Sequence, residues 1–361
     1  MCMNSMDLKR PILSISLLSS GRAGTIEKCL NSLIPLKKAM ATEIIVVDTS
    51  DGNNDKVSGI LKQYADKVIP FKWCNDFSAA TNKGLQVISG EWFLYIDDDE
   101  YFIDSKPLID FLLSEEKDKF GWANLVRRDF RDSDLTIYTD AWLSRLFPVT
   151  DDIRFVGRIH EYISPVCGAL CNIDALIGHT GYIFQTTEQK IAHAKRNMDL
   201  LEIQIADEPL EVRWVFQAME ECDDLGDRHK ELELAQKGYD LMRGGNGHEA
   251  KIIRGLFAAN IVRLPAMQND WITTLSAYDE MLSGEEIGDI SRAYMEISAA
   301  CASYNLGDFY NAKEHCRTYL DYYNKYANSP ITDPDEYTYF QAGTFLERSY
   351  NMIKSMFEEI K

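Results

Sequence analysis

The sequence predicts an α/β domain built on a mostly parallel β-sheet, followed by an all-α domain of helical hairpins. Over the first hundred residues, continuous apolar runs alternate with segments of helical hydrophobic spacing, which is typical of a parallel sheet covered by helices on both faces. Beyond Thr187 the strand-like runs stop, and Leu, Ala, Tyr and Met recur at helical spacing. We therefore expect two domains, at residues 10–186 and 187–361 of this 361-residue chain.

The elements of the first domain are assigned from their hydrophobic spacing. Apolar runs predict strands at 12–18, 43–48, 68–71 and 91–96, and helical spacing predicts helices at 25–33, 57–65 and 77–89. Residues 121–185 mix aromatic and charged positions and give no such pattern. Ligands of parallel sheets bind beyond the carboxyl ends of the strands, so we expect the polar clusters that follow three of these strands to converge. These clusters are Ser19–Arg22, Asp48–Asp51 and Asp97–Glu100.

Two segments of the second domain resemble each other. CDDLGDRHKELELAQKGYDL begins at Cys222 and ASYNLGDFYNAKEHCRTYL begins at Ala302, and each places Leu-Gly-Asp before a further helix. Because glycine permits the tight turn between paired helices, this pattern predicts helical hairpins similar to tetratricopeptide repeats.

The composition argues against several classes of function. Lys and Arg number 38 against 57 Asp and Glu, a formal net charge of −19, which disfavours nucleic-acid binding and adhesion to an anionic membrane. The 8 cysteines include no CxxC pair, which favours reduced thiols in a cytoplasmic protein. The apolar run at 12–18 is too short for a membrane span, and no other run approaches the necessary length.

Asp97-Asp98-Asp99-Glu100 follows a strongly apolar strand. Four carboxylates at the mouth of a buried strand repel one another unless a cation neutralises them, and hard divalent cations prefer carboxylate oxygens as ligands. Such a cation keeps open positions for phosphate oxygens, which would allow an acidic protein to bind an anionic diphosphate. The pattern favours a divalent-cation site, and a solvated acidic turn is the alternative.

Six short segments carry a more specific signal. They are VVDTSDG (46–52), NDFSAATNKGL (75–85), FLYIDDDE (93–100), RLF (145–147), FVGRIHE (155–161) and HTGY (179–182). In this order and spacing they resemble glycosyltransferase family 2, which has the GT-A fold of nucleotide-diphospho-sugar transferases. The resemblance covers roughly residues 10–200. It extends to a bacterial subgroup with C-terminal tetratricopeptide-like helices, similar to the peptide S-glycosyltransferases of glycocin biosynthesis.

The resemblance implies a site for a UDP-sugar donor and a divalent cation, Mn²⁺ or Mg²⁺. Asp48 would accept a hydrogen bond from the uracil base, and Asp97 and Asp98 would contact ribose and metal. Asp99 would be the principal metal ligand and His179 a further ligand from the far side, with a hydrogen-bonded core histidine as the alternative for His179. The other implied donor-binding residues are Ser19, Ser20, Arg22, Asp76, Asn82, Arg145 and Arg158, of which Arg145 and Arg158 would pair with the diphosphate.

Family 2 enzymes invert the anomeric centre by direct displacement, so the acceptor needs a base placed opposite the leaving diphosphate. The resemblance implies Glu161 in FVGRIHE as this base. His160 is the alternative base, because an unperturbed imidazole titrates near neutrality. A surface turn without a chemical role is the alternative for both residues.

The sequence thus predicts an inverting hexosyl- or N-acetylhexosaminyltransferase with a peptide, protein or glycan acceptor. A catalytically inactive nucleotide-sugar-binding scaffold with a helical interaction domain is the second hypothesis. A nucleotidyltransferase is a third, but its usual Gly-rich basic loop is reduced here to Gly21, Arg22 and Gly24. The helical domain is expected to supply no catalytic group and to mediate homodimerisation, to hold the acceptor, or both.

Overall fold

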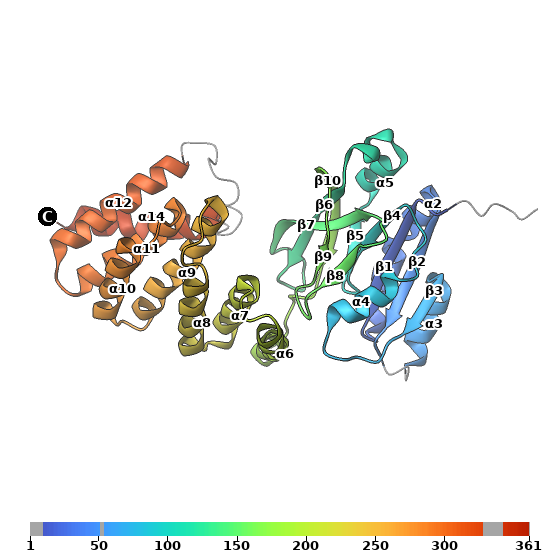
Figure 1. Cartoon of the computed structure of the whole chain (residues 1–361), viewed down its shortest axis with the longest axis horizontal. Coiled ribbons are helices and arrows are strands. Elements are labelled where there is room, and N and C mark those ends of the chain that lie inside the picture. Colours follow the sequence, from blue (N-terminus) through green and yellow to red (C-terminus); the bar gives the residue numbers. More distant parts are fainter. Residues whose placement is uncertain (1–9, 51–53, 328–341, 361) are drawn as a thin grey trace, which may run out of the picture. The chain divides into compact units, whose positions relative to one another are not determined.

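The computed structural model describes residues 10–50, 54–327 and 342–360 of the chain (Figure 1). Its internal contacts divide the chain into two compact units, Met1–Lys190 and Ile191–Lys361. Asp51 and Gly52, from the segment expected to contact the nucleotide, lie outside the described residues.

A mostly parallel sheet forms the centre of the first unit. Its strands are β1 (Leu13–Ser19), β2 (Thr42–Asp48), β3 (Lys67–Pro70), β4 (Trp92–Tyr95), β5 (Glu100–Asp104), β6 (Trp122–Phe130), β7 (Tyr138–Pro148) and β10 (Leu170–His179). They lie in the order β3-β2-β1-β4-β7-β6-β10-β5, and β8 (Arg154–Val156) and β9 (Tyr162–Ser164) form a separate ribbon. Neighbouring strands are parallel except where β7 or β5 is a partner, so both run against the other six. The predicted α/β domain with a mostly parallel sheet is confirmed.

The alternation of side chains along the strands gives this sheet two apolar faces. Leu13, Ile15 and Leu17 of β1 point into a large core shared with the first, third and fifth helices. Phe93 and Tyr95 of β4 point the opposite way, into a smaller core with residues of the β8–β9 ribbon. Tyr95 therefore faces the ribbon that carries the FVGRIHE segment. The helices are α1 (Ala23–Ser32), α2 (Ile34–Ala39), α3 (Asp55–Tyr64), α4 (Phe77–Leu85) and α5 (Lys106–Leu113), followed by a 3₁₀ helix at Glu115–Lys119.

Helix α4 ends earlier than the helical spacing predicts. The expected helix runs to residue 89, whereas α4 ends at Leu85. Beyond it the chain packs against β1, where the N–H of Gly90 donates to Ser14 Oγ at 2.8 Å. A Cβ on Gly90 would lie 2.7 Å from the backbone nitrogen of Ser14, so this approach requires glycine and ends the helix.

The β6 and β10 strands form a parallel pair with an irregular register. Ile173 lies opposite Leu125, but Leu176 lies opposite Val126, so β10 carries two extra residues between these pairs. Beyond the bulge the pairing is regular again and places His179 directly opposite Asp129.

The second unit is helical, as predicted. Both Leu-Gly-Asp motifs form the same turn: Gly226 and Gly307 adopt φ values of 70° and 79°, and the following Asp227 and Asp308 accept hydrogen bonds from N–H groups of the next helix. Consecutive helices from α7 to α12 pack against one another, which confirms the helical hairpins. The helices are α6 (Thr187–Asp207), α7 (Val212–Leu225), α8 (Arg228–Leu241), α9 (His248–Met267), α10 (Trp271–Ser283), α11 (Asp289–Asn305), α12 (Phe309–Ala327) and α14 (Ala342–Glu359).

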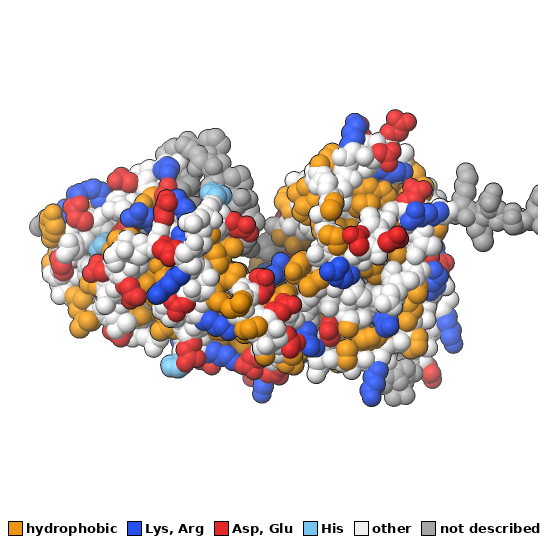
Figure 2. Space-filling view, in the orientation of Figure 1, with side chains coloured by type: hydrophobic (Ala, Val, Ile, Leu, Met, Phe, Trp, Pro, Cys, Tyr) orange, Lys and Arg blue, Asp and Glu red, His pale blue; other side chains and the backbone are white. Residues whose placement is uncertain are grey.

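The surface of both units mixes charges of the two signs. Figure 2 shows acidic and basic side chains interspersed with hydrophobic ones on the face that it draws. Among the described helices, none is long and apolar enough to cross a membrane.

Candidate active site

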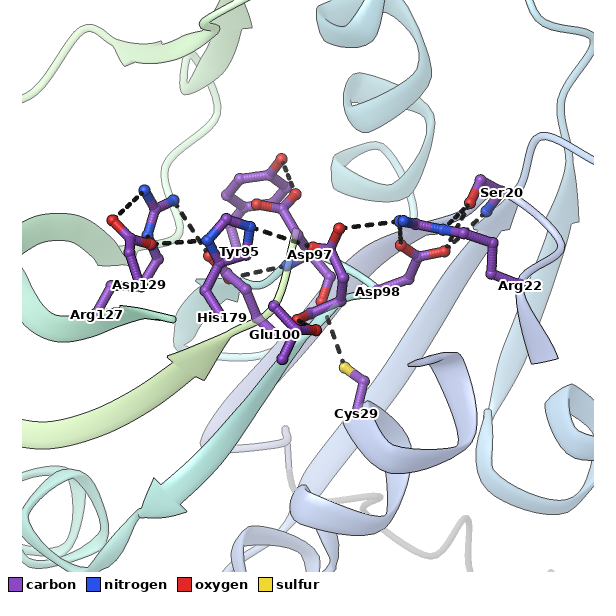
Figure 3. A network of polar contacts seen from close by, with 12 residues as sticks. Ser20, Arg22, Cys29, Tyr95, Asp97, Asp98, Glu100, Arg127, Asp129 and His179 are labelled. Carbon is purple, nitrogen blue, oxygen red and sulfur yellow. Dashed lines mark hydrogen bonds and ion pairs between the residues drawn. The ribbon is translucent and has the colours of Figure 1, made fainter. Parts of the chain in front are cut away.

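The polar clusters that follow β1, β2 and β4 meet at one edge of the sheet, as the sequence predicts. Ser20 donates from its backbone nitrogen and from its hydroxyl to Asp98 Oδ2, at 3.0 Å each. The N–H of Thr49, just after β2, donates to the carbonyl of Ser19 at 2.9 Å. Figure 3 shows the resulting polar network, which extends from Ser20 through the acidic loop to Asp129. We define the acidic loop as Asp97–Glu100.

Arg22 reaches the acidic loop from the N-terminus of α1. Its Nη2 contacts Asp98 Oδ1 and lies 3.0 Å from Asp99 Oδ2, and its Nε donates to the hydroxyl of Ser20 at 2.9 Å. Burial raises the pKa of Asp98, although the charge of Arg22 opposes the rise. One guanidinium thus neutralises part of the charge of two neighbouring carboxylates.

His179 approaches Asp99 from the end of β10. Its Nε2 lies 3.7 Å from Asp99 Oδ1, and its Nδ1 lies 2.7 Å from Asp129 Oδ1. A carboxylate that accepts from one ring nitrogen leaves the lone pair of the other nitrogen for a cation, an arrangement common around metal-bound histidines. The His179 imidazole is therefore oriented so that Nε2 and the Asp99 carboxylate could hold one cation between them.

Gly181 keeps the space beside these two groups open. A Cβ at this position would lie 2.4 Å from His179 Nε2 and 2.9 Å from Asp99 Oδ2. Among the described residues, no three His, Cys, Asp or Glu side chains are grouped to hold a metal ion by themselves. A site with two protein ligands agrees with this, because Mg²⁺ and similar cations often bind through one or two side chains plus the phosphates of a substrate. The residues present therefore fit a cation that binds together with a diphosphate.

Replacing Gly181 by Ala is expected to weaken Mn²⁺ binding in the presence of UDP by about tenfold or more, because the methyl group would enter the space between the two ligands. Isothermal titration calorimetry measures the effect. Gly59→Ala is the matched control, since a Cβ there has no atom within 4 Å. Equal Mn²⁺ affinity in both variants would contradict the placement of the cation between Asp99 and His179.

Tyr95 links the acidic loop to the predicted base. Its hydroxyl lies 2.6 Å from Asp97 Oδ1 and 2.9 Å from Glu161 Oε1. Burial, followed by the charge of Asp97, raises the pKa of Glu161 to about 7. Burial also acts to raise the pKa of Asp97, but Arg145 and the Tyr95 hydroxyl outweigh it and the pKa is lowered. Asp97 is thus ionised and accepts a hydrogen bond from the Tyr95 hydroxyl. Glu161 is the carboxyl that exchanges a proton near neutral pH.

Arg145 and Glu100 form the buried floor of the acidic loop. Arg145 Nη2 lies 3.1 Å from Asp97 Oδ2 and 2.5 Å from Glu100 Oε1, and 7% of its side chain is exposed. Glu100 also accepts from the backbone nitrogen of Asp97 at 3.0 Å. Arg145 thus shapes the acidic loop, and its predicted pairing with a diphosphate stays a prediction. The same contacts turn the Asp97 carboxylate toward Arg145 and Tyr95, and its predicted role as a metal ligand stays a prediction.

Three other predicted donor-binding residues lie near the ends of β2 and α4. Asp48 Oδ1 accepts from the backbone nitrogen and hydroxyl of Ser50 at 3.0 and 2.6 Å, which orders the turn after β2. Asp76 caps α4 by accepting from Ala79 N at 2.8 Å, and its other oxygen lies 3.8 Å from Arg158 Nη1. The structure thus places Arg158 beside Asp76.

The side chains of Asn82 and Ser19 are engaged within the protein. The Asn82 amide donates to Phe155 O at 3.0 Å and accepts from Phe155 N at 2.8 Å. Ser19 is fully buried, and its hydroxyl accepts from Gly21 N at 3.4 Å. Asn82 thus holds β8, which leads to Glu161, and Ser19 closes the loop after β1; their predicted contacts with the donor stay predictions.

His160, the alternative base, precedes Glu161 and adopts a left-handed backbone conformation with φ 51°. Sequence reasoning did not identify Tyr95, Asp129, Arg127 or Gly181 as site residues. Arg127 Nε lies 2.8 Å from Asp129 Oδ1, and this contact holds the carboxylate that orients His179. Gly181 belongs to the quoted HTGY segment and Tyr95 to the quoted FLYIDDDE segment, whereas Arg127 and Asp129 lie outside all the quoted segments.

A protein-family model described as glycosyl transferase family 2 matches residues 19–144. A TPR repeat-containing protein of Synechococcus elongatus is 29% identical over 218 residues, which cover 55% of this chain and 49% of that protein. The SPbeta prophage-derived glycosyltransferase SunS of Bacillus subtilis is 27% identical over 211 residues, which cover 57% of this chain and 48% of that protein. The chain spans about half the length of the curated relatives it matches.

Two solved structures are similar at low identity. The mannosyltransferase PcManGT from Pyrobaculum calidifontis, in complex with GDP-Man and Mn²⁺, is 14% identical with a TM-score of 0.36; the match covers 76% of this chain and 88% of that chain. TarS of S. aureus, in complex with UDP-GlcNAc, is 9% identical with a TM-score of 0.41, and the match covers 87% of this chain and 92% of that chain.

Proposed function

Since the chain carries a glycosyltransferase family 2 domain at residues 19–144, we propose that the protein transfers a hexose or N-acetylhexosamine from a UDP-sugar to a peptide, protein or glycan acceptor. The transfer inverts the anomeric centre and requires Mn²⁺ or Mg²⁺. The observation that carries the proposal is the pair of Asp99 and His179, whose ligating atoms lie 3.7 Å apart beside Gly181.

The donor half of the site lies beyond the ends of β1, β2 and β4. Asp99 and His179 would hold the cation, which when bound would neutralise charge on the diphosphate. Asp48, the last residue of β2, would accept a hydrogen bond from the base. Arg22, at the N-terminus of α1, supplies a positive charge near the diphosphate.

Glu161 would act on the acceptor. Its carboxylate accepts the proton of the acceptor nucleophile while the bond from that nucleophile to the anomeric carbon forms and the bond to the UDP oxygen breaks. A pKa of about 7 leaves much of the carboxylate able to accept a proton at neutral pH. The Tyr95 hydroxyl, at 2.9 Å, fixes the position of the carboxylate.

A thermal-shift panel of UDP, GDP and UDP-sugars with and without Mn²⁺ tests this proposal. UDP at 100 times its dissociation constant should stabilise the fold by about 2.7 kcal/mol when Mn²⁺ is present, and much less without it. Slow Mn²⁺-dependent release of free sugar from the same UDP-sugar would distinguish an enzyme from a nucleotide-binding scaffold. Stabilisation by UDP without any sugar release would favour the scaffold, and no stabilisation by any nucleotide would remove the donor assignment.

The acceptor is proposed to dock on a groove of the helical unit. This groove has a volume of about 1010 Å³ and lies between α8, the C-terminal half of α9 and α10. Its wall includes Ile272, which is 73% exposed, and the carboxylates of Glu233, Asp240 and Glu280 against the single ammonium of Lys237. An apolar wall with an acidic rim favours an acceptor peptide that carries basic side chains.

Ile272→Asp is expected to raise the KM for a peptide acceptor by about tenfold, because a buried apolar contact of this size is worth 1–2 kcal/mol. Release of sugar to water should stay unchanged, since the donor site is in the other unit. Leu210→Asp, at a position that is 81% exposed and does not line the groove, is the control. An unchanged KM in the Ile272 variant would contradict docking of the acceptor in this groove.

We also propose a homodimer formed through the helical unit. Leu306, Phe309 and Tyr310 place exposed apolar surface around one hairpin turn, and Tyr310 is 76% exposed. Light scattering after size-exclusion chromatography measures the mass of the particle. The proposed cytoplasmic location is supported by the cysteines, because all seven in the described residues are free thiols.

A further inference from the structure

Arg22 contacts the same carboxylates that a cation would neutralise. Its Nη2 contacts Asp98 Oδ1 and lies 3.0 Å from Asp99 Oδ2, while Asp99 Oδ1 faces His179 Nε2. The Asp99 carboxylate is therefore shared between a guanidinium on one side and the imidazole on the other. A bound cation and the Arg22 guanidinium are both positively charged and would repel each other at this carboxylate. Each would therefore weaken the binding of the other.

The position of Arg22 allows it to move. Its side chain is 51% exposed, whereas those of Asp98 and Asp99 are 6% and 14% exposed. The guanidinium thus lies at the mouth of the acidic loop, and its departure would open no cavity in the core. Its backbone precedes the first turn of α1, where N–H groups and the helix dipole favour an anion. A guanidinium that swings away from the loop therefore remains beside a place suited to a diphosphate.

We propose that Arg22 and the divalent cation compete for Asp99, and that the displaced Arg22 pairs with the diphosphate of the donor. This inference rests on the proposed function, because it assumes a cation and a nucleotide diphosphate at this site. Arg22 weakens binding of the cation alone and strengthens binding of the cation together with UDP. The enzyme thereby favours the complete metal–donor complex over the metal by itself.

The test is Arg22→Gln in the full-length protein, with two affinities measured by isothermal titration calorimetry. Affinity for Mn²⁺ without nucleotide should increase about three- to tenfold, the range expected when a partly exposed ion pair is removed. Affinity for UDP at saturating Mn²⁺ should fall about tenfold, because a charge-assisted hydrogen bond to the diphosphate is lost. Arg22→Lys keeps the charge and should lie closer to the wild type in both measurements.

Lys28→Gln is the matched control. It removes one positive charge from the same helix, and its ammonium lies over the ring of Tyr101, 3.4 Å from the ring centre. A similar gain in Mn²⁺ affinity for Lys28→Gln would attribute the effect to net charge and overturn the inference. Unchanged or weaker Mn²⁺ binding by Arg22→Gln would also overturn it, even where the wild type binds UDP with Mn²⁺ and the proposed function stands. A wild type that binds neither UDP nor a UDP-sugar, with or without Mn²⁺, would reject the proposed function itself.

Discussion

Replacing Glu161 by Gln is expected to lower the turnover of sugar transfer by about 10²-fold or more while leaving UDP affinity nearly unchanged, as for the loss of a general base. Gln has almost the same shape and keeps a hydrogen bond with the Tyr95 hydroxyl, which lies 2.9 Å from Glu161 Oε1. The variant therefore loses the ability to take a proton and little else. Initial rates at saturating donor and acceptor, together with calorimetric UDP affinity, measure the two effects separately.

The pH dependence follows from the raised pKa of Glu161. The ordinary pKa near 4.5 is raised to about 7, so kcat/KM should rise tenfold per pH unit below 7 and level off above it. Protonated Glu161 is favoured in the folded state, so folding stability is lost as the pH rises from about 4.5 to 7. Above pH 7 this loss is on the order of 3 kcal/mol. Glu161→Gln should consequently unfold at a higher temperature than the wild type at pH 8, and the difference should vanish near pH 4.5.

Two further variants are compared with Glu161→Gln. Glu91→Gln makes the same Glu-to-Gln change just before β4, at the end of that strand away from the acidic loop. This variant should leave sugar transfer and its pH profile unaltered. His160→Ala tests the alternative base. If this variant loses turnover and its pH dependence while Glu161→Gln keeps both, the roles of the two residues must be exchanged.

Asp99→Asn is expected to abolish both the Mn²⁺ dependence of UDP binding and measurable transfer. An amide oxygen is a neutral and poorer ligand for hard cations than a carboxylate. Asp99 is also the group that faces both Arg22 Nη2, at 3.0 Å, and His179 Nε2, at 3.7 Å, so its charge is central to the site. Calorimetric titration of UDP with and without Mn²⁺ gives the first effect, and a sugar-transfer assay gives the second.

The control for this variant is Asp110→Asn, at an exposed residue of α5 that pairs with Lys106. It should bind UDP and Mn²⁺ as the wild type does. Transfer by Asp99→Asn at the wild-type rate would show that the cation, if there is one, is held by other groups. Asp98 would then be the first residue to replace in the search for the metal ligand.

The sequence predicts the parallel half of the sheet well because β1, β2 and β4 are buried on both faces and stand out as apolar runs. Residues 121–185 escaped prediction for a physical reason. In β7, for example, Trp142 is exposed while Arg145 is buried by ion pairing, so hydrophobicity does not follow the alternation of the strand. The helical unit was predictable because each Leu-Gly-Asp motif encodes its turn locally.

The candidate site was predictable where function lies within one segment. Asp98, Asp99, His179 and Glu161 were named from short motifs, and the structure brings all four into one polar network. Asp129 was not predicted, because it contacts His179 through strand pairing across 50 positions of sequence. No local sequence pattern records such a contact. The contacts of Asn82 and Ser19 within the protein were not predicted either, because a polar side chain near a site can bond to the backbone as readily as to a ligand.

The bulge in β10 makes the spacing of residues along this strand part of the chemistry. If the two extra residues between Ile173 and Leu176 were paired regularly with β6 instead of forming the bulge, Ile177 would stand opposite Asp129. His179 would then sit beyond the carboxylate that orients it, although every residue of the site were still present. Removal of Asp174 and Ala175 would instead bring Leu176 directly after Ile173 and keep His179 opposite Asp129, so a homologue with a regular β10 needs a strand that is two residues shorter to preserve this alignment.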